Sequence, residues 1–222
     1  MLSCRGLGKT YRTERGPVDA VRGVDLAVAA GRYVAIIGRS GSGKSSLMAM
    51  IGGLSRPTAG SIVVDGADIW ALPDDGLAEF RNRRIGYVFQ FQSLLPTLRL
   101  ADNVALPALL HRRESTADIY SRAAGLLGRM GLAGYVDAYP SEVSAGEQRR
   151  AVIARALING PALVLADEPT SDLDEQTEIE IMTELKRVNR EAGTTLVLVT
   201  HNLALAEAAD EVVHIAEGVV VR

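Results

Sequence analysis

The sequence lacks several features that would point to particular classes of protein. Cys4 is its only cysteine, which excludes an intrachain disulfide and a four-cysteine zinc site. Its 24 basic and 27 acidic residues give a formal net charge of −3, without the basic excess typical of nucleic-acid-binding proteins. There is no N-terminal signal pattern, and no stretch approaches the ~20 apolar residues of a membrane-spanning helix. We therefore expect no nucleic-acid partner, and any membrane contact only through another protein.

Aliphatic side chains are abundant, since 47% of the 222 residues are hydrophobic and only 5% are aromatic. Apolar runs of strand length alternate with helix-like segments, which predicts an α/β fold with a largely parallel sheet. Residues 33–37, 163–166 and 196–199 are predicted to be buried strands. Residues 212–215 and 219–221 flank Glu217-Gly218 and predict a hairpin at the sheet edge.

The middle of the chain has a different character. From about residue 91 to 158 it is rich in Leu, Ala and Arg and lacks β-branched runs, which favours helices. We predict one domain over residues 1–222, with a core at approximately 1–90 and 159–222 and an inserted helical subdomain at approximately 91–158. A further amphipathic helix is predicted from Asp174 to Glu191.

A glycine-rich loop follows the strand at 33–37. Residues 38–45 match the P-loop pattern of Gly, four residues and then Gly-Lys-Ser. In this pattern backbone N–H groups surround phosphate oxygens, Lys44 reaches the β- and γ-phosphates, and the Ser45 hydroxyl binds Mg²⁺. A helix from Lys44 to Gly52-Gly53 adds its positive N-terminal end. The predicted nucleotide-binding residues here are Gly38, Arg39, Ser40, Gly41, Ser42, Gly43, Lys44, Ser45 and Ser46.

Two consecutive acids end the predicted strand at 163–166. Ligands bind at the carboxyl ends of strands in open α/β sheets, so Asp167 and Glu168 are expected beside the P-loop. Asp167 is predicted to hold Mg²⁺, and Glu168 to polarise the attacking water, which a hydrolase needs and a kinase does not. The alternative is a pair of solvated acids after a strand. The combination predicts an Mg²⁺-dependent ATP hydrolase.

A third motif lies upstream of these acids, at Val143-Ser144-Ala145-Gly146-Glu147-Gln148-Arg149-Arg150. It looks like the signature of ABC transporter nucleotide-binding subunits, commonly Leu-Ser-Gly-Gly-Gln/Glu. With the P-loop and the acids, it makes the chain resemble these subunits over its whole length. The resemblance implies a P-loop NTPase fold of ABC type, with a RecA-like core, an antiparallel β region and an inserted helical subdomain. It also implies that Ser144 and Gly146 bind the γ-phosphate of ATP held by a second copy, so that two chains enclose two ATPs.

Other positions match the family in order along the chain. Tyr11 corresponds to the aromatic that stacks on adenine, Gln90 to the glutamine that binds Mg²⁺ and senses the membrane partner, and His201 to the switch histidine at the γ-phosphate. The resemblance thus implies Glu168, His201 and Gln90 as catalytic residues, and Ser45, Gln90 and Asp167 as Mg²⁺ ligands. Tyr11, Gln90 and His201 each also have an ordinary structural interpretation.

The segment Ser171-Asp172-Leu173-Asp174 matches the family loop that crosses the dimer interface, although Asp174 could also cap the next helix. Two positions depart from the family pattern: Ala145 replaces the first signature glycine, and Val143 replaces leucine. Because Ser144 and Gly146 are retained, we expect a working site. His111 and His214 match no family position.

Segments 89–98 and 102–107 look like those of the macrolide-exporter and lipoprotein-release branch, and the cell-division relatives look similar. The resemblance implies a homodimeric, peripheral ATP-binding subunit at the cytoplasmic face of the membrane. It would drive a separate integral-membrane permease in export or extraction, with a permease helix docking near residues 90–100. The alternative is an ATP-gated regulatory subunit that controls a membrane partner and cell-wall hydrolases without moving cargo.

Overall fold

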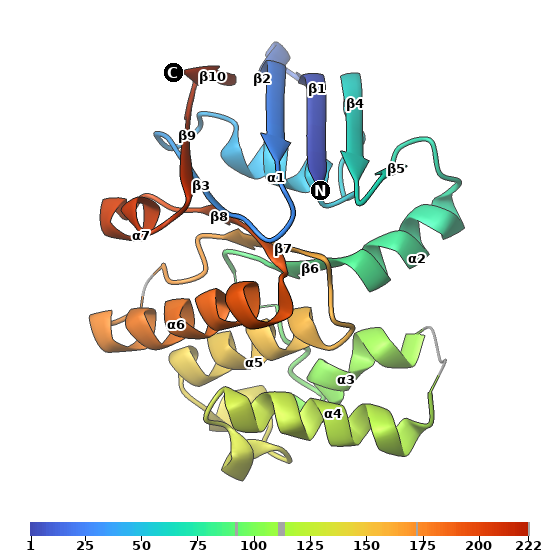
Figure 1. Ribbon diagram of the computed structural model, residues 1–222, viewed down its shortest axis with the longest axis vertical. Coiled ribbons are helices and arrows are strands. Elements are labelled where there is room, and N and C mark those ends of the chain that lie inside the picture. The colour runs from blue at the N-terminus through green and yellow to red at the C-terminus, as the bar shows by residue number, and fades with distance from the viewer. Residues whose placement is uncertain (92, 111–113, 172, 222) are drawn as a thin grey trace.

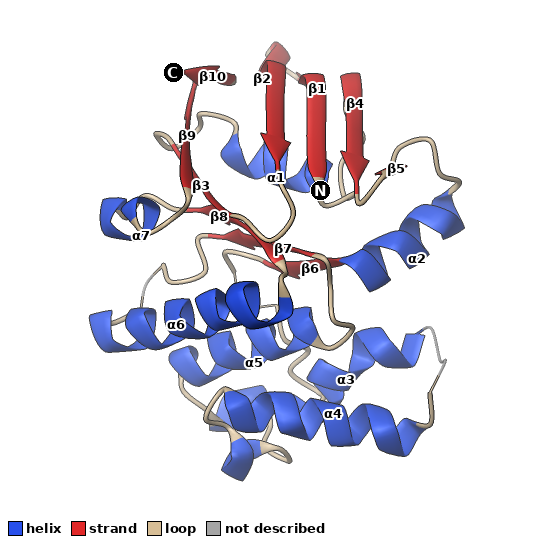
Figure 2. Cartoon of the chain, in the orientation of Figure 1, coloured by secondary structure: helices blue, strands red, loops and turns tan. Residues whose placement is uncertain are grey.

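Residues 1–91, 93–110, 114–171 and 173–221 are described by a computed structural model of the chain. They form layers that follow one another from top to bottom of Figure 1: an antiparallel sheet, a mostly parallel sheet and a group of helices. Figure 2 shows that strands dominate the upper half of the molecule and helices the lower half. The predicted α/β fold with an antiparallel β region and inserted helices is confirmed.

The antiparallel sheet is built mainly by the first part of the chain. Its strand order is β2-β1-β4-β5, and the strands are β1 (Leu2–Thr13), β2 (Gly16–Val28), β4 (Ala59–Val64) and β5 (Ala67–Asp68). Along β2, Val24, Leu26 and Val28 are buried while Asp25 and Ala27 are exposed. This alternation gives the sheet one apolar face that packs on the interior and one face toward solvent.

The second sheet is parallel except at one edge. Its order is β10-β9-β3-β8-β7-β6, and the strands are β3 (Tyr33–Ile37), β6 (Ile85–Val88), β7 (Leu163–Asp167), β8 (Thr195–Val199), β9 (Glu211–Ala216) and β10 (Val219–Val221). Every residue of β3, β7 and β8 is buried, as expected for strands covered on both faces. The antiparallel β9–β10 pair confirms the predicted hairpin at the sheet edge.

The parallel sheet separates two apolar cores. Leu163 and Leu165 of β7 join the core toward the antiparallel sheet, and Val164 and Ala166 join the core toward the helices. Successive side chains of a strand point to opposite faces, so one short apolar strand contributes to both cores. This explains why β7 reads as a continuous apolar run that ends abruptly at Asp167.

The helices are α1 (Lys44–Ile51), α2 (Asp74–Arg84), α3 (Leu100–Leu110), α4 (Thr116–Arg129), α5 (Ala145–Leu157), α6 (Glu175–Ala192) and α7 (Leu203–Glu207), with short 3-10 turns η1 (Ala133–Tyr135) and η2 (Pro140–Glu142). Four of the helices, α3 to α6, lie below the parallel sheet in Figure 1, whereas α1 lies above it, toward the antiparallel sheet. Helices α3, α4 and α5 come between β6 and β7 in the chain, where the sequence predicts helices. The boundaries of a separate core and helical subdomain stay a prediction.

Two helix boundaries follow from local chemistry. Helix α1 begins at Lys44 as predicted, after Gly43 in a left-handed conformation with φ of 102°. Helix α6 begins at Glu175, and the Asp174 carboxylate caps it by accepting a hydrogen bond from the backbone N–H of Thr177 at 3.0 Å. Within the described ranges, no helix combines the length and the apolar character needed to cross a membrane.

Candidate active site

Three loops that carry predicted site residues meet at the edge of the parallel sheet where the carboxyl ends of its central strands lie. Strand β8 lies between β3 and β7 and pairs in parallel with both. The P-loop follows β3, Glu168 follows β7, and His201 comes two residues after β8. Because neighbouring parallel strands have their carboxyl ends on the same side of the sheet, the topology brings these three loops together.

A cleft of about 510 Å³ opens at this edge. Apart from Ala20, every residue that lines it is a predicted site residue; the full lining is Ala20, Gly38, Ser40, Gly41, Gly43, Lys44, Ser45, Ser46, Gln90, Glu168 and His201. Predicted residues that are far apart in the chain therefore share one cavity. Ala20 of β2 carries no sequence motif and was not predicted.

Two P-loop glycines are required by close backbone approach. A Cβ on Gly38 would lie 2.1 Å from the carbonyl oxygen of Ile215, and one on Gly43 would lie 2.1 Å from that of Ala20. Gly43 also has φ of 102°, where side chains other than hydrogen are strained. The neighbouring strands thus enclose the loop tightly enough to hold its backbone N–H groups in place.

The charged groups of the cleft are partly buried. Lys44 Nζ donates to the carbonyl oxygens of Gly38 at 2.8 Å and Arg39 at 3.0 Å, so its ammonium is held within the loop. Burial raises the pKa of Asp167, and the nearby charge of Glu168 acts in the same direction. A hydrogen bond with Ser45 and the charge of Lys44 act on the pKa of Asp167 in the opposite direction.

The donor set suits a magnesium ion. Asp167 is only 7% exposed, and its buried Oδ1 has no hydrogen-bond partner among the described residues. Beside it lies the Ser45 hydroxyl, and Mg²⁺ prefers such oxygen ligands together with phosphate oxygens. Across the described parts of the chain, no cluster of three or more His, Cys, Asp or Glu side chains could hold a metal ion by itself. A Mg²⁺ ion held here would need further oxygen ligands, which water and the phosphates of a nucleotide supply.

Glu168 and His201 form a contact at the cleft. His201 Nδ1 lies 2.9 Å from Glu168 Oε2, and the His201 side chain is 71% exposed while that of Glu168 is 18% exposed. Glu168 has a φ of 47°, a left-handed conformation that is uncommon and strained for a residue with a side chain. Its N–H donates to the Val199 carbonyl at 2.9 Å, which stabilises this turn. The strained turn directs the carboxylate to the cleft.

Tyr11 and Gln90 lie at the margins of the cleft. The Tyr11 hydroxyl donates to Ser46 Oγ at 3.3 Å, and the Tyr11 side chain is exposed, as a platform for a base would be. Gln90 lines the cleft, and its backbone carbonyl oxygen accepts a hydrogen bond from Arg149 Nη2 at 2.7 Å. Arg149 belongs to the quoted signature segment, but no role was predicted for it.

Ser144 and Gly146 do not line the cleft of their own chain. Ser144 is the N-cap of α5: its hydroxyl donates to Glu147 Oε2 at 2.8 Å and accepts from the Glu147 N–H at 3.3 Å. Hydrogen bonds from the backbone and side chain of Ser144 hold the pKa of Glu147 below its usual range. Within one chain the structure brings together the P-loop half of the predicted site, and the signature residues stand apart from it.

Some predicted positions fall outside the described residues. These are Gln92 in the branch-specific segment and Asp172 in the predicted interface loop; His111, for which no role was predicted, also lies outside the described residues. Of that loop, Ser171 Oγ donates to the Glu168 carbonyl at 3.1 Å. The interface loop is therefore connected to the turn that carries Glu168.

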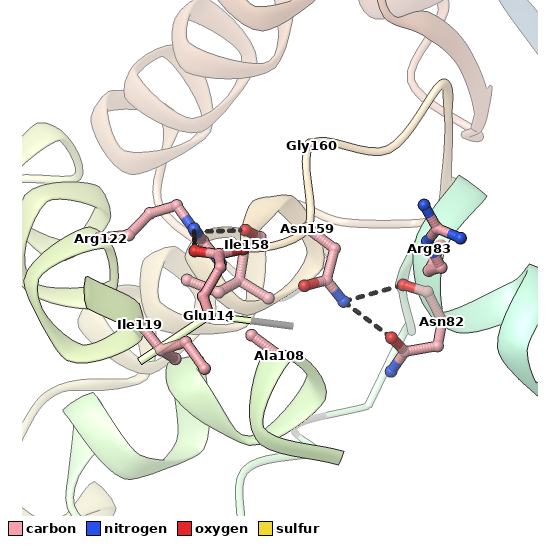
Figure 3. Close-up of a pocket in the computed structure, with 9 residues that line it drawn as sticks. All are labelled: Asn82, Arg83, Ala108, Glu114, Ile119, Arg122, Ile158, Asn159 and Gly160. Atoms are coloured by element: carbon pink, nitrogen blue, oxygen red, sulfur yellow. Dashed lines mark hydrogen bonds and ion pairs between the residues drawn. The ribbon is translucent and has the colours of Figure 1, made fainter. Parts of the chain in front are cut away.

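A second cavity, of about 370 Å³, lies between the C-terminal end of α2, helices α3 and α4, and the exit of α5 (Figure 3). Asn159 Nδ2 donates to the backbone oxygen and to Oδ1 of Asn82 at 2.9 and 3.0 Å, and Arg122 pairs with Glu114 and donates to the Ile158 carbonyl. These polar groups already satisfy one another. No predicted site residue lines this cavity, so we assign it no part in catalysis.

A groove of about 390 Å³ adjoins that cavity. It is lined from α2, β6, α3 and α5, including Tyr87, Phe89 and Leu106. Nearby, Phe91 and Leu110 are 66% and 68% exposed, and the rings of Tyr87, Phe89 and Phe91 stack in sequence with centroid distances of 4.2 and 5.3 Å. The chain therefore presents an apolar aromatic surface next to Gln90.

Comparison with known proteins gives consistent matches. The family model described as ABC transporter matches residues 21–171. A lipoprotein-releasing system ATP-binding protein LolD of Syntrophotalea carbinolica is 44% identical over 98% of this chain and 96% of that protein. A macrolide export ATP-binding/permease protein MacB of Syntrophobacter fumaroxidans is 43% identical over 99% of this chain but only 31% of that protein. The chain thus spans about a third of MacB and nearly all of LolD.

A solved structure shares the fold over the whole chain. The ATP-binding cassette MJ0796, determined as a dimer in a post-hydrolysis state with ADP and Pi, superimposes with a TM-score of 0.94 at 37% identity. The match covers 100% of this chain and 97% of that chain.

Proposed function

The chain belongs to the ABC transporter family and is an ATPase of that type, and on this premise we propose that two copies of it drive a separate membrane permease by binding and hydrolysing ATP. The observation that carries the proposal is the single cleft that unites the P-loop with Gln90, Glu168 and His201. ATP and Mg²⁺ are the ligands this set of groups suits.

In the proposed reaction each side chain has a separate task. The P-loop N–H groups and Lys44 hold the β- and γ-phosphates, and Glu168 orients the attacking water and accepts its proton. His201, 2.9 Å from Glu168, steadies the γ-phosphate and the carboxylate together. Ser45, Gln90 and Asp167 would hold Mg²⁺, which supplies positive charge to the phosphates.

A second copy completes the site in this proposal. Ser144 and Gly146 stand apart from the cleft of their own chain, at the N-terminal end of α5, where N–H groups and the helix dipole favour a phosphate. The MJ0796 cassette, determined as a dimer with ADP and Pi, supports the pairing of two copies, and we propose that each signature helix then faces the nucleotide of the other copy. Tyr11 would stack on the adenine at the rim.

The permease contact is proposed at the apolar groove beside Gln90. Exposed Phe91 and Leu110 are large apolar side chains whose burial would favour association. The name of MacB, an ATP-binding/permease protein, supports a permease partner for this chain too. We propose that the chain works as a peripheral subunit at the cytoplasmic face of the membrane, in export or extraction of a substrate.

The main alternative keeps the same ATPase site but moves no cargo. An ATP-gated subunit that controls a membrane partner and cell-wall hydrolases would need the same P-loop, Asp167 and Glu168. The membrane protein that co-purifies with the chain separates the two. A permease with a large extracytoplasmic domain favours transport, and a partner that binds wall hydrolases favours regulation.

Substitution of Glu168 by Gln tests the proposed hydrolysis. It removes the general base and keeps the size of the side chain, so ATPase turnover should fall about 10²–10⁴-fold while ATP still binds. Size-exclusion chromatography with Mg-ATP should then show dimers that accumulate because they cannot reopen. Glu191→Gln, at the exposed end of α6, is the matched control and should keep the wild-type rate. Normal turnover in Glu168→Gln would show that the assigned role is wrong.

A further inference from the structure

Glu178 of α6 bridges the loops that follow β7 and β8. Its Oε2 accepts a hydrogen bond from the Thr170 hydroxyl at 2.8 Å, and its Oε1 accepts one from Asn202 Nδ2 at 2.8 Å. Each carboxylate oxygen therefore receives one donor, and the donors come from two different loops. Such charge-assisted hydrogen bonds are among the stronger ones in proteins.

The two loops carry the two groups of the catalytic contact. Thr170 lies two residues after Glu168, and Asn202 directly follows His201. Glu178, its two donors and the Glu168–His201 pair all line a polar cavity of about 170 Å³. This cavity shares Glu168 and His201 with the phosphate cleft. Glu178 thus shares this second cavity with Glu168 and His201, and none of the described P-loop residues lines it.

The bridge rests on a rigid support. Three and four residues further along α6, Ile181 and Met182 are buried in the core, as is Leu185. In contrast, the His201 side chain is 71% exposed, so packing does little to fix its position. A catalytic group on an exposed loop is held accurately only when a second layer of hydrogen bonds supports it.

We propose that Glu178 is a positioning residue that holds Glu168 and His201 in their relative positions through its hydrogen bonds to both loops. The inference rests on the proposed ATPase function of this site. Glu178 touches neither phosphate nor water in this role. It acts through Thr170 on the turn of Glu168 and through Asn202 on His201.

Substitution of Asn202 by Asp tests one arm of the bridge. Aspartate keeps the N-cap of α7, where the Asn202 side chain accepts from the Ala204 N–H, but it places a second carboxylate against Glu178. We expect kcat to fall about 10- to 100-fold, the scale for misplaced catalytic groups, with the KM for ATP changed less than about threefold. Thr170→Val replaces the hydroxyl with a methyl group of similar size and should lower kcat in the same way.

The decisive variant combines Asn202→Asp with Glu178→Gln. The amide introduced by Glu178→Gln can donate to the new aspartate while its oxygen accepts from Thr170, so the bridge is rebuilt with one donor and one acceptor exchanged. We expect kcat to recover to within about threefold of the wild type. The double variant has the same net charge at the bridge as the wild type, so its recovery is read together with Thr170→Val, which breaks the other hydrogen bond without any change of charge.

Glu184→Gln serves as the matched control, since the Glu184 carboxylate pairs with Arg187 of the same helix and should leave kcat unchanged. The inference is overturned if Asn202→Asp and Thr170→Val hydrolyse ATP at the wild-type rate, or if the double variant is as slow as Asn202→Asp alone. A wild-type chain without ATPase activity would instead overturn the proposed function. Thermal unfolding of each variant establishes that the protein tested is folded.

Discussion

Removal of the buried guanidinium of Arg149 should destabilise the folded chain. Arg149 lies on α5, is only 5% exposed, and donates to the carbonyl oxygens of Phe89 at 2.6 Å and Gln90 at 2.7 Å. These contacts fasten the segment that carries Gln90 to the helix that begins at the signature residues. Substitution by Met keeps much of the length of the side chain and removes both donors.

The expected loss follows from the two hydrogen bonds. A hydrogen bond that involves a charged group contributes about 1.5–3 kcal/mol, so two give about 3–6 kcal/mol in the free energy of unfolding. Gln90 is exposed and Phe89 is half-buried, so water can reach the vacated carbonyls after a small rearrangement. We therefore expect a loss near the lower end, about 3 kcal/mol. For a chain of this size the same loss lowers Tm by about 6–12 °C.

Urea unfolding of the nucleotide-free chain measures the loss. The midpoint should fall while the slope m stays the same, because the surface exposed on unfolding hardly changes. Arg5→Met, at an exposed position of β1, is the control and should change the free energy of unfolding by less than about 0.5 kcal/mol. If Arg149→Met lost less than about 1 kcal/mol, the two contacts would not hold the Gln90 segment as argued.

Three further predictions concern single positions. Gly146→Ala would place a Cβ 2.9 Å from Cγ2 of Thr177, so the Thr177 side chain or its helix must shift, with a loss of about 1–3 kcal/mol in urea unfolding and lower ATPase activity. Gly125→Ala, in α4 with no atom within 4 Å of the new Cβ, should instead gain about 0.5–1 kcal/mol in the same assay. Asp167→Asn removes a carboxylate whose pKa burial raises, so at neutral pH the nucleotide-free variant should be more stable than the wild type while its ATPase activity is lost. That gain should shrink as the pH falls through the raised pKa of Asp167 and vanish below the unfolded-state value, because the wild-type carboxyl is then neutral in both states; equal stability of the two proteins across this range would contradict the argument.

Much of the fold and of the phosphate half of the site could be predicted because the relevant signals are local. The P-loop pattern specifies a strand, a tight loop and a helix start within a few residues, and Lys44 begins α1 as expected. The run at 163–166 is apolar throughout because both faces of the strand are covered, and the first acid, Asp167, ends this run at the carboxyl end of the strand. Asp174 has two predicted roles, in the loop that crosses the dimer interface and as the cap of the next helix, and the cap is confirmed.

The unpredicted contacts are those between segments distant in the chain. Ala20 lies at the cleft because its carbonyl approaches Gly43, which requires Gly at position 43 but leaves no pattern around residue 20. Arg149 reaches back about 60 residues to Phe89 and Gln90, and Glu178 joins loops that follow different strands. Charged residues on amphipathic helices normally face solvent, so periodicity alone would place Arg149 and Glu178 on exposed faces. Only the assembled sheet order reveals their partners.

The contacts of Arg149 connect two parts of the proposed site within one chain, the signature end of α5 and the segment that carries Gln90. Helix α5 carries Ser144 and Gly146 at its start and Arg149 slightly more than one turn further along, with the guanidinium on the carbonyl of Gln90. In the proposed dimer, Ser144 and Gly146 face the partner's nucleotide, whereas Gln90 faces the chain's own cleft and lies next to the apolar groove. A displacement of the Gln90 segment must therefore either break two charge-assisted hydrogen bonds or move α5 with it. Breaking them costs about 3 kcal/mol, and this cost couples the position of the Gln90 segment to that of α5 and its signature residues. This gives a physical reason for a permease bound at the groove to affect both nucleotide sites at once.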